Sequence, residues 1–468
     1  MATYKKFGLI GNPLGHSLSA FIHQRIMEEA GIPGSYSLFD IPREDFDEAI
    51  VPLMRQLDGF NCTIPYKQAI LPFLPELDRS ARECRAVNTV YRGRGFNTDR
   101  EGFRAITAFS WQAKKVLLLG AGGVARMMAW EACSQGADLT ICARNASQRK
   151  ALAEELRLSF GGEVREGDVS HHRYDVILNG TPLGMWPHTR QTPTDGMDLS
   201  KLFHENQTVI DTIYNPCPTK WLMQAAAAGA RTADGLSMLL HQAVAAQRIW
   251  NPELEIDDSI SERILPELQQ QLYKQFPYKI ILTGFMGSGK STIAALLGEA
   301  LSLPVIDIDR EIEKASGCSI AQIFEESGEA AFREREQRVI AEVLNQPGAA
   351  VIAFGGGAIL QPAVQDLCNS LPVINIFLRS SIEYSWQRIR HQNHRPLIAS
   401  SDTNGAIASS DTTAPNVSTT ESEGERFTKA AALLAERLPT YEKSADITID
   451  ADLDKKTVCT RILRIFGV

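Results

Sequence analysis

Two glycine-rich motifs of different kinds, each directly after an apolar run, constrain this chain more than any other feature. The first motif is VLLLGAGGVA, residues 116–125. An apolar strand, a glycine turn and a helix in this order are typical of dinucleotide-binding folds, here with alanine in place of the third glycine. The second motif is IILTGFMGSGKST, residues 280–292, which matches the mononucleotide P-loop at every fixed position. The two motifs predict an enzyme that uses two different nucleotides in separate domains.

The alternation of apolar runs and helical stretches predicts an α/β fold in several domains. The chain has 468 residues, enough for about three compact units. Residues 1–102 form a first α/β domain, completed by a helix over about 236–255. Residues 103–235 repeat strand and helix, which predicts a doubly wound, Rossmann-like sheet. Residues 256–276 are charged and helix-compatible and are expected to be a linker, and 277–468 form a P-loop α/β domain with a parallel sheet.

Composition argues against several classes of partner. The net charge is −8, so neither nucleic acid nor an anionic membrane is expected to bind. The eight cysteines show no CxxC pair, which favours reduced thiols in a cytosolic protein. The first residues lack a signal-peptide core, and no apolar run reaches membrane-spanning length. We therefore expect a cytoplasmic enzyme with small-molecule substrates. Its oligomeric state is left open.

The first motif is expected to hold the pyrophosphate of a dinucleotide. The expected contacts are Gly120, Ala121, Gly122, Gly123, Val124 and Ala125. NAD-binding folds usually have an acidic residue after the second strand, where this chain has Arg144, followed by Arg149. Because guanidinium groups pair well with a 2′-phosphate, NADP(H) is favoured over NAD.

Polar clusters in the first hundred residues predict a site for a small acid. Ser17 and Ser19 stand two residues apart just before a helix, where hydroxyl and backbone N–H groups suit a carboxylate or, more simply, cap the helix. Further polar clusters follow in NCTIPYK, AVNTV and GFNTDREGF.

Together with NGTPLGM, DTIYNPCPTKWL and GLSMLLHQA, these strings resemble shikimate dehydrogenase over about 1–255. The resemblance implies NADPH-dependent reduction of 3-dehydroshikimate to shikimate. It also implies site residues: Ser17, Ser19 and Tyr214 at the substrate carboxylate, Thr63, Asn88 and Gln242 at the ring hydroxyls, and Lys67 with Asp99 as the catalytic pair.

The chemistry of hydride transfer fits that pair. Hydride delivery leaves negative charge on a carbonyl oxygen, which a lysine ammonium can neutralise with a proton while a carboxylate orients it. One departure concerns the cofactor: the family's N-R-T sequence reads Ala143-Arg144-Asn145 here. This weakens the expected discrimination between NADP and NAD without reversing it. Quinate as an additional substrate is left open.

The P-loop is expected to hold a nucleoside triphosphate. Its contacts are Gly287, Ser288, Gly289, Lys290, Ser291 and Thr292, with Lys290 at the terminal phosphates and Ser291 on Mg²⁺. Asp307 and Asp309 are predicted on one side of an extended strand end. One carboxylate would complete the Mg²⁺ shell and the other would take a hydroxyl proton.

The strings around these residues, in this order, resemble shikimate kinase over about 277–468. The resemblance implies that ATP phosphorylates the shikimate 3-hydroxyl, which Asp309 orients, while Asp307 serves Mg²⁺ and Lys290 takes part in catalysis. The remaining implied contacts are Arg333, Arg437, Gly355, Gly356 and Gly357 for shikimate, Arg395 in the lid for the phosphates of ATP, and Arg388 for its adenine side.

The lid of the second domain, about 394–428, departs from the family pattern. Residues 399–424 are rich in Ser, Thr and Ala and lack aromatic residues, so the segment is expected to be mobile, and deleting 400–423 should leave the kinase active. The abnormal lid leaves open a second interpretation, an active dehydrogenase fused to a regulatory ATP-binding domain. A non-catalytic metabolite sensor is a third, against which Lys67, Asp99, Lys290 and Asp309 argue.

Overall fold

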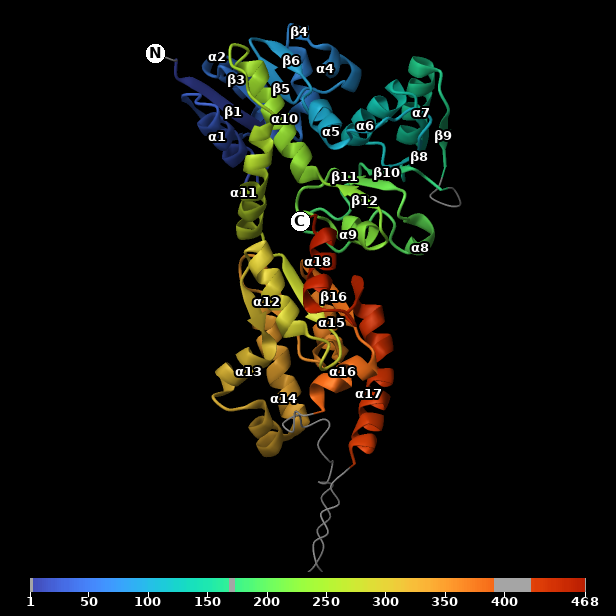
Figure 1. Cartoon of the computed structure of the whole chain (residues 1–468). Coiled ribbons are helices and arrows are strands. Elements are labelled where there is room, and N and C mark those ends of the chain that lie inside the picture. The colour runs from blue at the N-terminus through green and yellow to red at the C-terminus, as the bar shows by residue number, and fades with distance from the viewer. Residues whose placement is uncertain (1–2, 168–172, 391–421, 468) are drawn as a thin grey trace, which may run out of the picture. The chain divides into compact units, whose positions relative to one another are not determined.

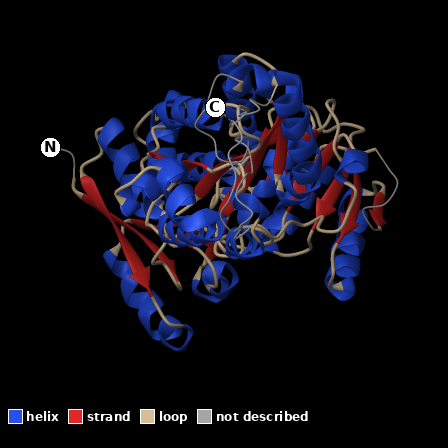
Figure 2. Cartoon of the chain, turned by 90° about the horizontal axis from the view of Figure 1, so that it is seen from below, coloured by secondary structure: helices blue, strands red, loops and turns tan. Residues whose placement is uncertain are grey.

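The structure is a computed structural model that describes residues 3–167, 173–390 and 422–467 (Figure 1). Contacts divide the chain between Gln275 and Phe276 into two compact units. The strands form three sheets, and helices lie on both sides of the strands (Figure 2). The α/β fold class is thereby confirmed. Over the described ranges, no helix combines the length and apolar character needed to cross a membrane.

The first sheet gathers the ends of several strands at one edge. Its order is β2–β1–β3–β5–β6–β4. β1 is parallel to β2 and β3, and β5 is antiparallel to both of its neighbours. The carboxyl ends of β1, β3 and β6 therefore meet the beginning of β5. The strands are β1 (Lys5–Gly11), β2 (Gly34–Asp40), β3 (Gly59–Cys62), β4 (Glu76–Leu77), β5 (Thr89–Tyr91) and β6 (Arg94–Phe96).

Five helices accompany this sheet: α1 (Ser19–Glu29), α2 (Phe46–Gln56), α3 (Tyr66–Ala69), α4 (Arg79–Cys84) and α5 (Asp99–Ile106). Three of them, α1, α3 and α5, begin in loops that leave the carboxyl edge. The order of strands and helices thus brings three segments that are distant in sequence to one edge of the sheet.

The second sheet is parallel throughout, in the order β12–β11–β10–β7–β8–β9. Strand order reverses between β7 and β10, the point at which doubly wound sheets bind nucleotides. In β7, Val116 and Leu118 enter one hydrophobic cluster and Leu117 and Leu119 the other, because successive side chains face opposite sides. The strands are β7 (Lys115–Leu119), β8 (Asp138–Cys142), β9 (Val164–Glu166), β10 (Val176–Asn179), β11 (Thr208–Asp211) and β12 (Arg231–Ala233).

The helices around the second sheet are α6 (Gly123–Ser134), α7 (Ala146–Phe160), α8 (Leu199–Leu202) and α9 (Lys220–Ala227). Helix α10 (Gly235–Trp250) follows β12 and packs against α1 and α5 of the first sheet. The approach to α5 is close, because a Cβ on Gly102 would lie 2.5 Å from the Met238 carbonyl oxygen. Gly102 is therefore a packing requirement of the contact between these helices.

Residues 256–276, expected to be a linker, are mostly taken up by helix α11 (Ser259–Gln275). Its buried apolar residues recur every four positions: Ile260, Ile264, Leu268 and Leu272. This stripe packs against α1 and α10, beside which α11 lies in Figure 1, and Arg25 of α1 pairs with Glu267 at 2.8 Å. The segment thus forms a helix that packs on the first unit.

The second unit holds a parallel five-stranded sheet in the order β14–β15–β13–β16–β17. Helix α14 bends at Gly328, whose φ of 77° lies outside the helical region. The strands are β13 (Lys279–Thr283), β14 (Val305–Asp307), β15 (Ala350–Ala353), β16 (Val373–Arg379) and β17 (Ile447–Asp450). The helices are α12 (Lys290–Leu301), α13 (Ile308–Ser316), α14 (Ile320–Leu344), α15 (Pro362–Ser370), α16 (Ile382–Ile389), α17 (Glu423–Ser444) and α18 (Lys455–Ile465).

Candidate functional site

Lys67 and Asp99 form an ion pair at the carboxyl edge of the first sheet. Lys67 lies on α3, just after β3, and its Nζ is 2.6 Å from Asp99 Oδ2. Asp99 is the first residue of α5, so the carboxylate lies at the positive end of that helix. The two side chains are 27% and 16% exposed. The pair is thus reachable from solvent while largely enclosed.

Hydrogen bonds join this pair to two further predicted residues. Asn88 donates from Nδ2 to Asp99 Oδ1 at 2.9 Å and to Gln242 Oε1 at 3.4 Å. Thr98 donates from its backbone N–H to Asn88 Oδ1 at 2.7 Å, which fixes the orientation of the amide. These contacts join Lys67, Asp99, Asn88 and Gln242 in one polar network. Its members come from α3, α5, α10 and the loop before β5.

Asn61, the first residue of the predicted polar cluster NCTIPYK, supports the network through buried hydrogen bonds. It is 5% exposed and donates from Nδ2 to the Asn88 carbonyl and to Thr89 Oγ1, both at 3.0 Å. Its own Oδ1 accepts from the hydroxyl of Tyr36 at 2.8 Å. Asn61 lies inside the buried strand GFNC, where a polar side chain requires such partners.

The other predicted substrate residues lie outside this network. Ser17 Oγ accepts from the backbone N–H of Ser19 at 3.2 Å, while Leu18 is the N-cap residue of α1 and neither serine caps the helix. Thr63 follows β3 and lies against the end of β1, where the loop to Ser17 begins. Tyr214 follows β11, and burial raises the pKa of its hydroxyl. Among the described residues, no hydrogen bond links these four to Lys67 or Asp99.

A buried ion network anchors α5 next to Asp99. Arg100 Nε and Arg104 Nε each lie 2.6 Å from a carboxylate oxygen of Glu131, which is fully buried on α6. Arg100 also pairs with Glu83 of α4. Burial opposes ionisation of Glu131, but hydrogen bonds from both arginines hold its pKa below the usual value. The helix that begins with Asp99 is thereby tied to the helix that begins at the dinucleotide motif.

The dinucleotide motif forms a turn with open space in front of it. Gly120 has a φ of 110°, and Gly122 is the N-cap of α6. A Cβ on Gly122 or Gly123 would meet no atom within 4 Å, so protein packing does not require these glycines. By contrast, Ala125 is fully buried and packs against Gly180. The N-terminus of α6 is therefore open at these glycines, and a helix N-terminus favours a phosphate group.

The two arginines expected near the 2′-phosphate differ in their surroundings. Arg144 is exposed in the loop after β8 and makes no hydrogen bond or ion pair within the described chain. Arg149 pairs with Glu166 at 3.4 Å and donates to the Ala143 carbonyl at 3.0 Å. Asn145 caps α7 by accepting from the backbone N–H of Gln148. Arg144 is therefore the better candidate for an added anion.

The P-loop lies between β13 and α12 in the second unit. Gly284, Gly287 and Gly289 have positive φ values of 142°, 81° and 97°. Such backbone conformations allow successive N–H groups of a turn to point toward one bound anion. Lys290, the first residue of α12, donates to the carbonyls of Gly284 and Phe285 at 2.9 and 3.0 Å. This arrangement fits a phosphate chain.

Ser291 and Asp307 lie together, as a shared metal ion requires. Ser291 Oγ donates to Asp307 Oδ2 at 2.6 Å. Asp307 ends β14 and caps α13, and Asp309 lies in the first turn of α13. The expectation of an extended strand through both aspartates was therefore wrong: capping by Asp307 ends the strand. The described residues hold no cluster of three or more His, Cys, Asp or Glu side chains suited to a metal, but Mg²⁺ usually takes few protein ligands.

Polar side chains surround the glycine turn after β15. A Cβ on Gly355 would lie 2.9 Å from Asp309 Oδ1, and one on Gly357 would lie 2.6 Å from Arg333 Nη2. Tyr441 donates its hydroxyl to the Gly356 carbonyl. Gly355 and Gly357 are thus needed for the close approach of these side chains, whereas a Cβ on Gly356 would come no closer than 3.5 Å to another residue.

Both arginines expected to hold a carboxylate lie near Glu336 of α14. Arg333 donates from Nη1 to Glu336 Oε2 at 2.7 Å. Arg437 is 7% exposed, and its Nη1 is buried without a hydrogen-bond partner. A buried guanidinium nitrogen that lacks an acceptor is costly, so an anionic ligand fits here.

Glu336 was missed in the sequence. It is fully buried, accepts from Arg333 and from Gln361 Nε2 at 2.8 Å, and burial raises its pKa. The sequence feature that could have revealed Glu336 is its position three residues after Arg333 on one helix, a spacing at which side chains meet.

The remaining predicted ATP contacts are only partly described. Arg388 on α16 stacks on the ring of Tyr384, with Cζ 3.9 Å from the ring centroid, and donates to the Gly287 carbonyl at 3.4 Å. Arg388 therefore lies beside the P-loop. Arg395 and the segment 399–421 lie outside the described residues, as does most of the predicted lid.

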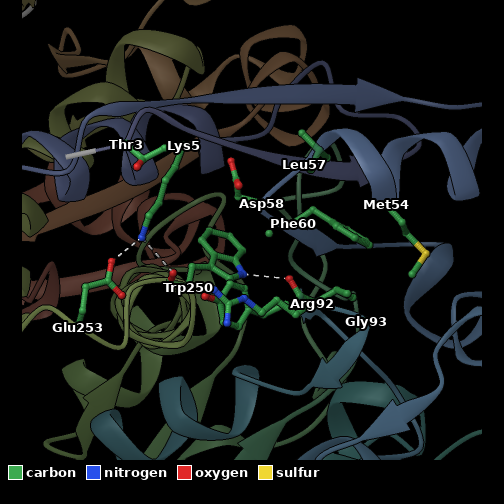
Figure 3. Close-up of a pocket in the computed structure, with 13 residues that line it drawn as sticks. Thr3, Lys5, Met54, Leu57, Asp58, Phe60, Arg92, Gly93, Trp250 and Glu253 are labelled. Carbon is green, nitrogen blue, oxygen red and sulfur yellow. Dashed lines mark hydrogen bonds and ion pairs between the residues drawn. The ribbon is translucent and has the colours of Figure 1, made fainter. Parts of the chain in front are cut away.

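A cavity of about 570 Å³ in the first unit is lined by other residues (Figure 3). It opens at the amino edge of the first sheet, where β1 and β3 begin, whereas Lys67 and Asp99 lie at the carboxyl edge. Lys5 pairs there with Glu253 at 2.6 Å beside the buried ring of Trp250. None of the predicted site residues lines it, so it is not the candidate active site.

Comparisons with known proteins give two families on one chain. A family model described as "Shikimate dehydrogenase substrate binding domain" matches residues 9–90, and one described as "Shikimate kinase" matches 286–466. A shikimate dehydrogenase (NADP(+)) of Methanopyrus kandleri is 36% identical over 279 residues, which cover 56% of this chain and 95% of the relative.

Solved structures agree over the same part of the chain. A shikimate 5-dehydrogenase of Thermus thermophilus, solved with NADP(H) and shikimate, is 30% identical with a TM-score of 0.50, covering 56% of this chain and 99% of that one. A chorismate mutase/shikimate 5-dehydrogenase fusion protein of Clostridium acetobutylicum is 34% identical with a TM-score of 0.51, covering 58% and 99%.

Proposed function

Because the N-terminal part of this chain belongs to the shikimate dehydrogenase family and a shikimate kinase domain follows it, we propose a bifunctional enzyme of the shikimate pathway. The first reaction is NADPH-dependent reduction of 3-dehydroshikimate to shikimate. The second is transfer of the ATP γ-phosphoryl group to the shikimate 3-hydroxyl. The observation that supports the proposal is that each unit brings together polar residues predicted for its own reaction, Lys67 with Asp99 and Asn88 in the first and Ser291 with Asp307 in the second.

In the first reaction, Lys67 is the proton donor. Bound NADPH would supply the hydride, and the substrate carbonyl oxygen then needs a proton within hydrogen-bond reach. The Lys67 ammonium can supply it while Asp99, 2.6 Å away, keeps the ammonium oriented. Asn88 holds the other Asp99 oxygen, so the carboxylate cannot turn away. The carboxylate of the substrate is assigned to Ser17, Ser19 and Tyr214, and its ring hydroxyls to Thr63, Asn88 and Gln242.

The cofactor of the first reaction is assigned to the α6 end of the second sheet. The open space in front of Gly122 and Gly123 supports a pyrophosphate there, on the helix N-terminus. Arg144 is assigned to the 2′-phosphate, since no carboxylate follows β8. These residues bind and orient the dinucleotide.

In the second reaction, the carboxylate of shikimate is assigned to Arg333 and Arg437. Two guanidinium groups suit bidentate recognition, and the unpartnered Nη1 of Arg437 supports an anion at this point. Asp309 lies across the glycine turn and would accept the proton of the 3-hydroxyl. Glu336 would hold Arg333 in place.

The nucleotide of the second reaction is assigned to the P-loop. Bound ATP would supply the phosphoryl group, with its phosphates on the backbone of 287–292 and on Lys290. Ser291 and Asp307 would hold Mg²⁺ from one side and leave the other positions to water and phosphate.

The proposed domain arrangement follows the sheets. Residues 1–102, with α10, form the substrate domain of the dehydrogenase, residues 103–235 its cofactor domain, and residues from 277 onward the kinase domain.

Two separate assays test the proposal. The purified chain should oxidise NADPH when given 3-dehydroshikimate and should form ADP when given shikimate and ATP. NADPH oxidation without ADP formation would refute the proposed kinase activity. It would support the alternative, an active dehydrogenase joined to an ATP-binding regulatory domain.

A further inference from the structure

One buried carboxylate, Asp211, holds both ends of the loop that carries Tyr214. Asp211 is the last residue of β11 and is fully buried. Its Oδ1 accepts from the backbone N–H of Ile213 at 3.0 Å, and its Oδ2 accepts from the hydroxyl of Thr219 at 2.8 Å. Thr219 is the N-cap residue of α9. The segment 213–219 is thus closed at both ends by a single side chain.

Two backbone contacts hold the same loop from outside. The Ile213 carbonyl accepts from the N–H of Gly235, the first residue of α10, at 3.2 Å. The Asn215 carbonyl accepts from the N–H of Trp186 at 2.9 Å. The residues on each side of Tyr214 are therefore fixed. Within the described residues the Tyr214 hydroxyl makes no hydrogen bond, so it can bind a ligand.

The same carboxylate also contacts the neighbouring strand. Asn179, the last residue of β10, donates from Nδ2 to Asp211 Oδ1 at 3.1 Å. The next residue, Gly180, lies so close to α6 that a Cβ on it would be 2.7 Å from the Cβ of Ala125. Asp211 thus lies between the loop of Tyr214 and the loop that packs on the dinucleotide motif.

The position of this carboxylate is costly in free energy. Burial raises the pKa of Asp211 to about 7, and the nearby Asp234 acts in the same direction. The hydrogen bonds from Ile213, Thr219 and Asn179 act in the opposite direction. A buried carboxylate needs such donors, and here they come from different segments of the chain. Asp211 therefore fixes the relative positions of these segments at a cost in stability.

We propose that Asp211 is a positioning residue of the dehydrogenase, which acts on the substrate through Tyr214. By holding both ends of the loop, Asp211 keeps the Tyr214 hydroxyl at the place assigned to the substrate carboxylate. Asp211 itself is fully buried, so its effect on the substrate is transmitted by the loop. The inference rests on the proposed dehydrogenase function and adds to it the residue that orients one of the carboxylate-binding groups.

A double-mutant cycle with KM for 3-dehydroshikimate as the readout tests this inference. Tyr214→Phe should raise KM about tenfold, the loss expected for one hydrogen bond to a charged group. Asp211→Ala should raise KM by a similar factor and change kcat much less, because Lys67 lies outside this network. The double variant should show no further rise, whereas independent effects would multiply to about a hundredfold.

Two further variants separate the hydrogen bonds of Asp211 from its charge. Asp211→Asn keeps an acceptor for Ile213 and can donate to the Thr219 hydroxyl, so KM should stay within about threefold of the unaltered value. Thr219→Val removes one of the two contacts that close the loop, so KM should rise, but less than in Asp211→Ala. The matched control is Asp198→Ala, which removes an exposed aspartate with the same kinds of donor and should leave KM unchanged.

The outcomes distinguish this inference from the proposed function. Multiplying effects in the cycle, an unchanged KM in Asp211→Ala, or the full rise in Asp211→Asn would overturn the role of Asp211 and leave the dehydrogenase proposal standing. An unchanged KM in Tyr214→Phe would overturn that role together with the assignment of Tyr214. An unaltered chain that does not reduce 3-dehydroshikimate would overturn the dehydrogenase proposal as well.

Circular dichroism shows which variants are folded. If Asp211→Ala does not fold, Thr219→Val takes its place in the cycle with Tyr214→Phe. The rise in KM caused by Thr219→Val should then disappear when Tyr214 is already phenylalanine. A rise of equal size in both backgrounds would overturn the inference.

Discussion

Lys67 Nζ lies 2.6 Å from Asp99 Oδ2, although the two residues are 32 positions apart in the sequence. The contact depends on the mixed sheet, which returns the chain through β5 and β6 to the edge at which β3 ends. The pair places a proton donor and the group that orients it at one point of the substrate domain.

Loss of Lys67 should abolish most of the reduction without affecting the cofactor. We expect Lys67→Ala to lower kcat for 3-dehydroshikimate by about 10²–10⁴, the usual contribution of general acid catalysis. NADPH affinity should change little, because Lys67 lies in the substrate domain. Steady-state kinetics and NADPH titration measure the two effects, with the exposed Lys201→Ala as the control. Normal turnover at saturation with collapsed substrate binding would refute the assigned role.

Arg144 and Arg149 should contribute unequally to the choice of NADP. Arg149 is already engaged by Glu166 and a backbone carbonyl, whereas Arg144 has no such partner among the described residues. Arg144→Ala should therefore raise KM for NADPH by about tenfold and leave KM for NADH unchanged. Arg149→Ala should have a smaller effect. The reverse order would show that Arg149 leaves Glu166 to bind the phosphate.

Arg437 should matter for shikimate and not for ATP. Its Nη1 is buried without a hydrogen-bond partner and is assigned to the shikimate carboxylate, so Arg437→Met should raise KM for shikimate by about 10–100-fold. KM for ATP should stay within a factor of about two if ATP binds only at the P-loop. Arg338→Met, which removes an exposed arginine of α14, is the control. Equal rises in both KM values would instead indicate a general structural defect.

His23 should make the first unit sensitive to acid. Complete burial lowers its pKa to about 3, from 6.5. Between these two values the unfolded chain binds a proton that the folded chain does not, so stability falls as the pH falls. The loss is about 1.4 kcal/mol per pH unit, or about 2 kcal/mol between pH 6.5 and 5.

Urea denaturation of the first unit at pH 7 and pH 5 measures this effect. His23→Gln keeps a hydrogen-bonding partner for Gln247 and removes the titration. The variant should lose about 2 kcal/mol less than the unaltered chain between these pH values. An identical loss in both proteins would show that His23 does not set the acid sensitivity.

Local motifs predicted the parts of the site that depend on neighbouring residues. The dinucleotide turn and the P-loop each place their glycines, a strand and a helix within a few positions, so their structure follows from short-range rules. The α/β class also followed, because buried parallel strands appear as continuous apolar runs such as VLLL.

Features that depend on long-range packing were harder to predict. Lys455 reaches the P-loop only because β17 pairs with β16, and no local pattern of α18 reveals this. The apolar residues of α11 recur at helical spacing in the sequence, as with Ile260 and Ile264 one turn apart. The charged residues between them nevertheless led to the prediction of a linker. The sequence predicted Asp309 at the end of a strand. In the structure the Asp307 side chain caps α13 by accepting a hydrogen bond from the Asp309 backbone N–H, so the strand ends at Asp307.

One measurement tests the central claim most directly: NADPH loss and ADP formation followed together in a single solution of the chain with 3-dehydroshikimate, NADPH and ATP. We expect ADP to appear only after 3-dehydroshikimate is added, and its amount to approach the amount of NADPH consumed. Lys67→Ala should suppress both signals, and shikimate should restore ADP formation in that variant. NADPH consumption without ADP, even with shikimate present, would contradict the account.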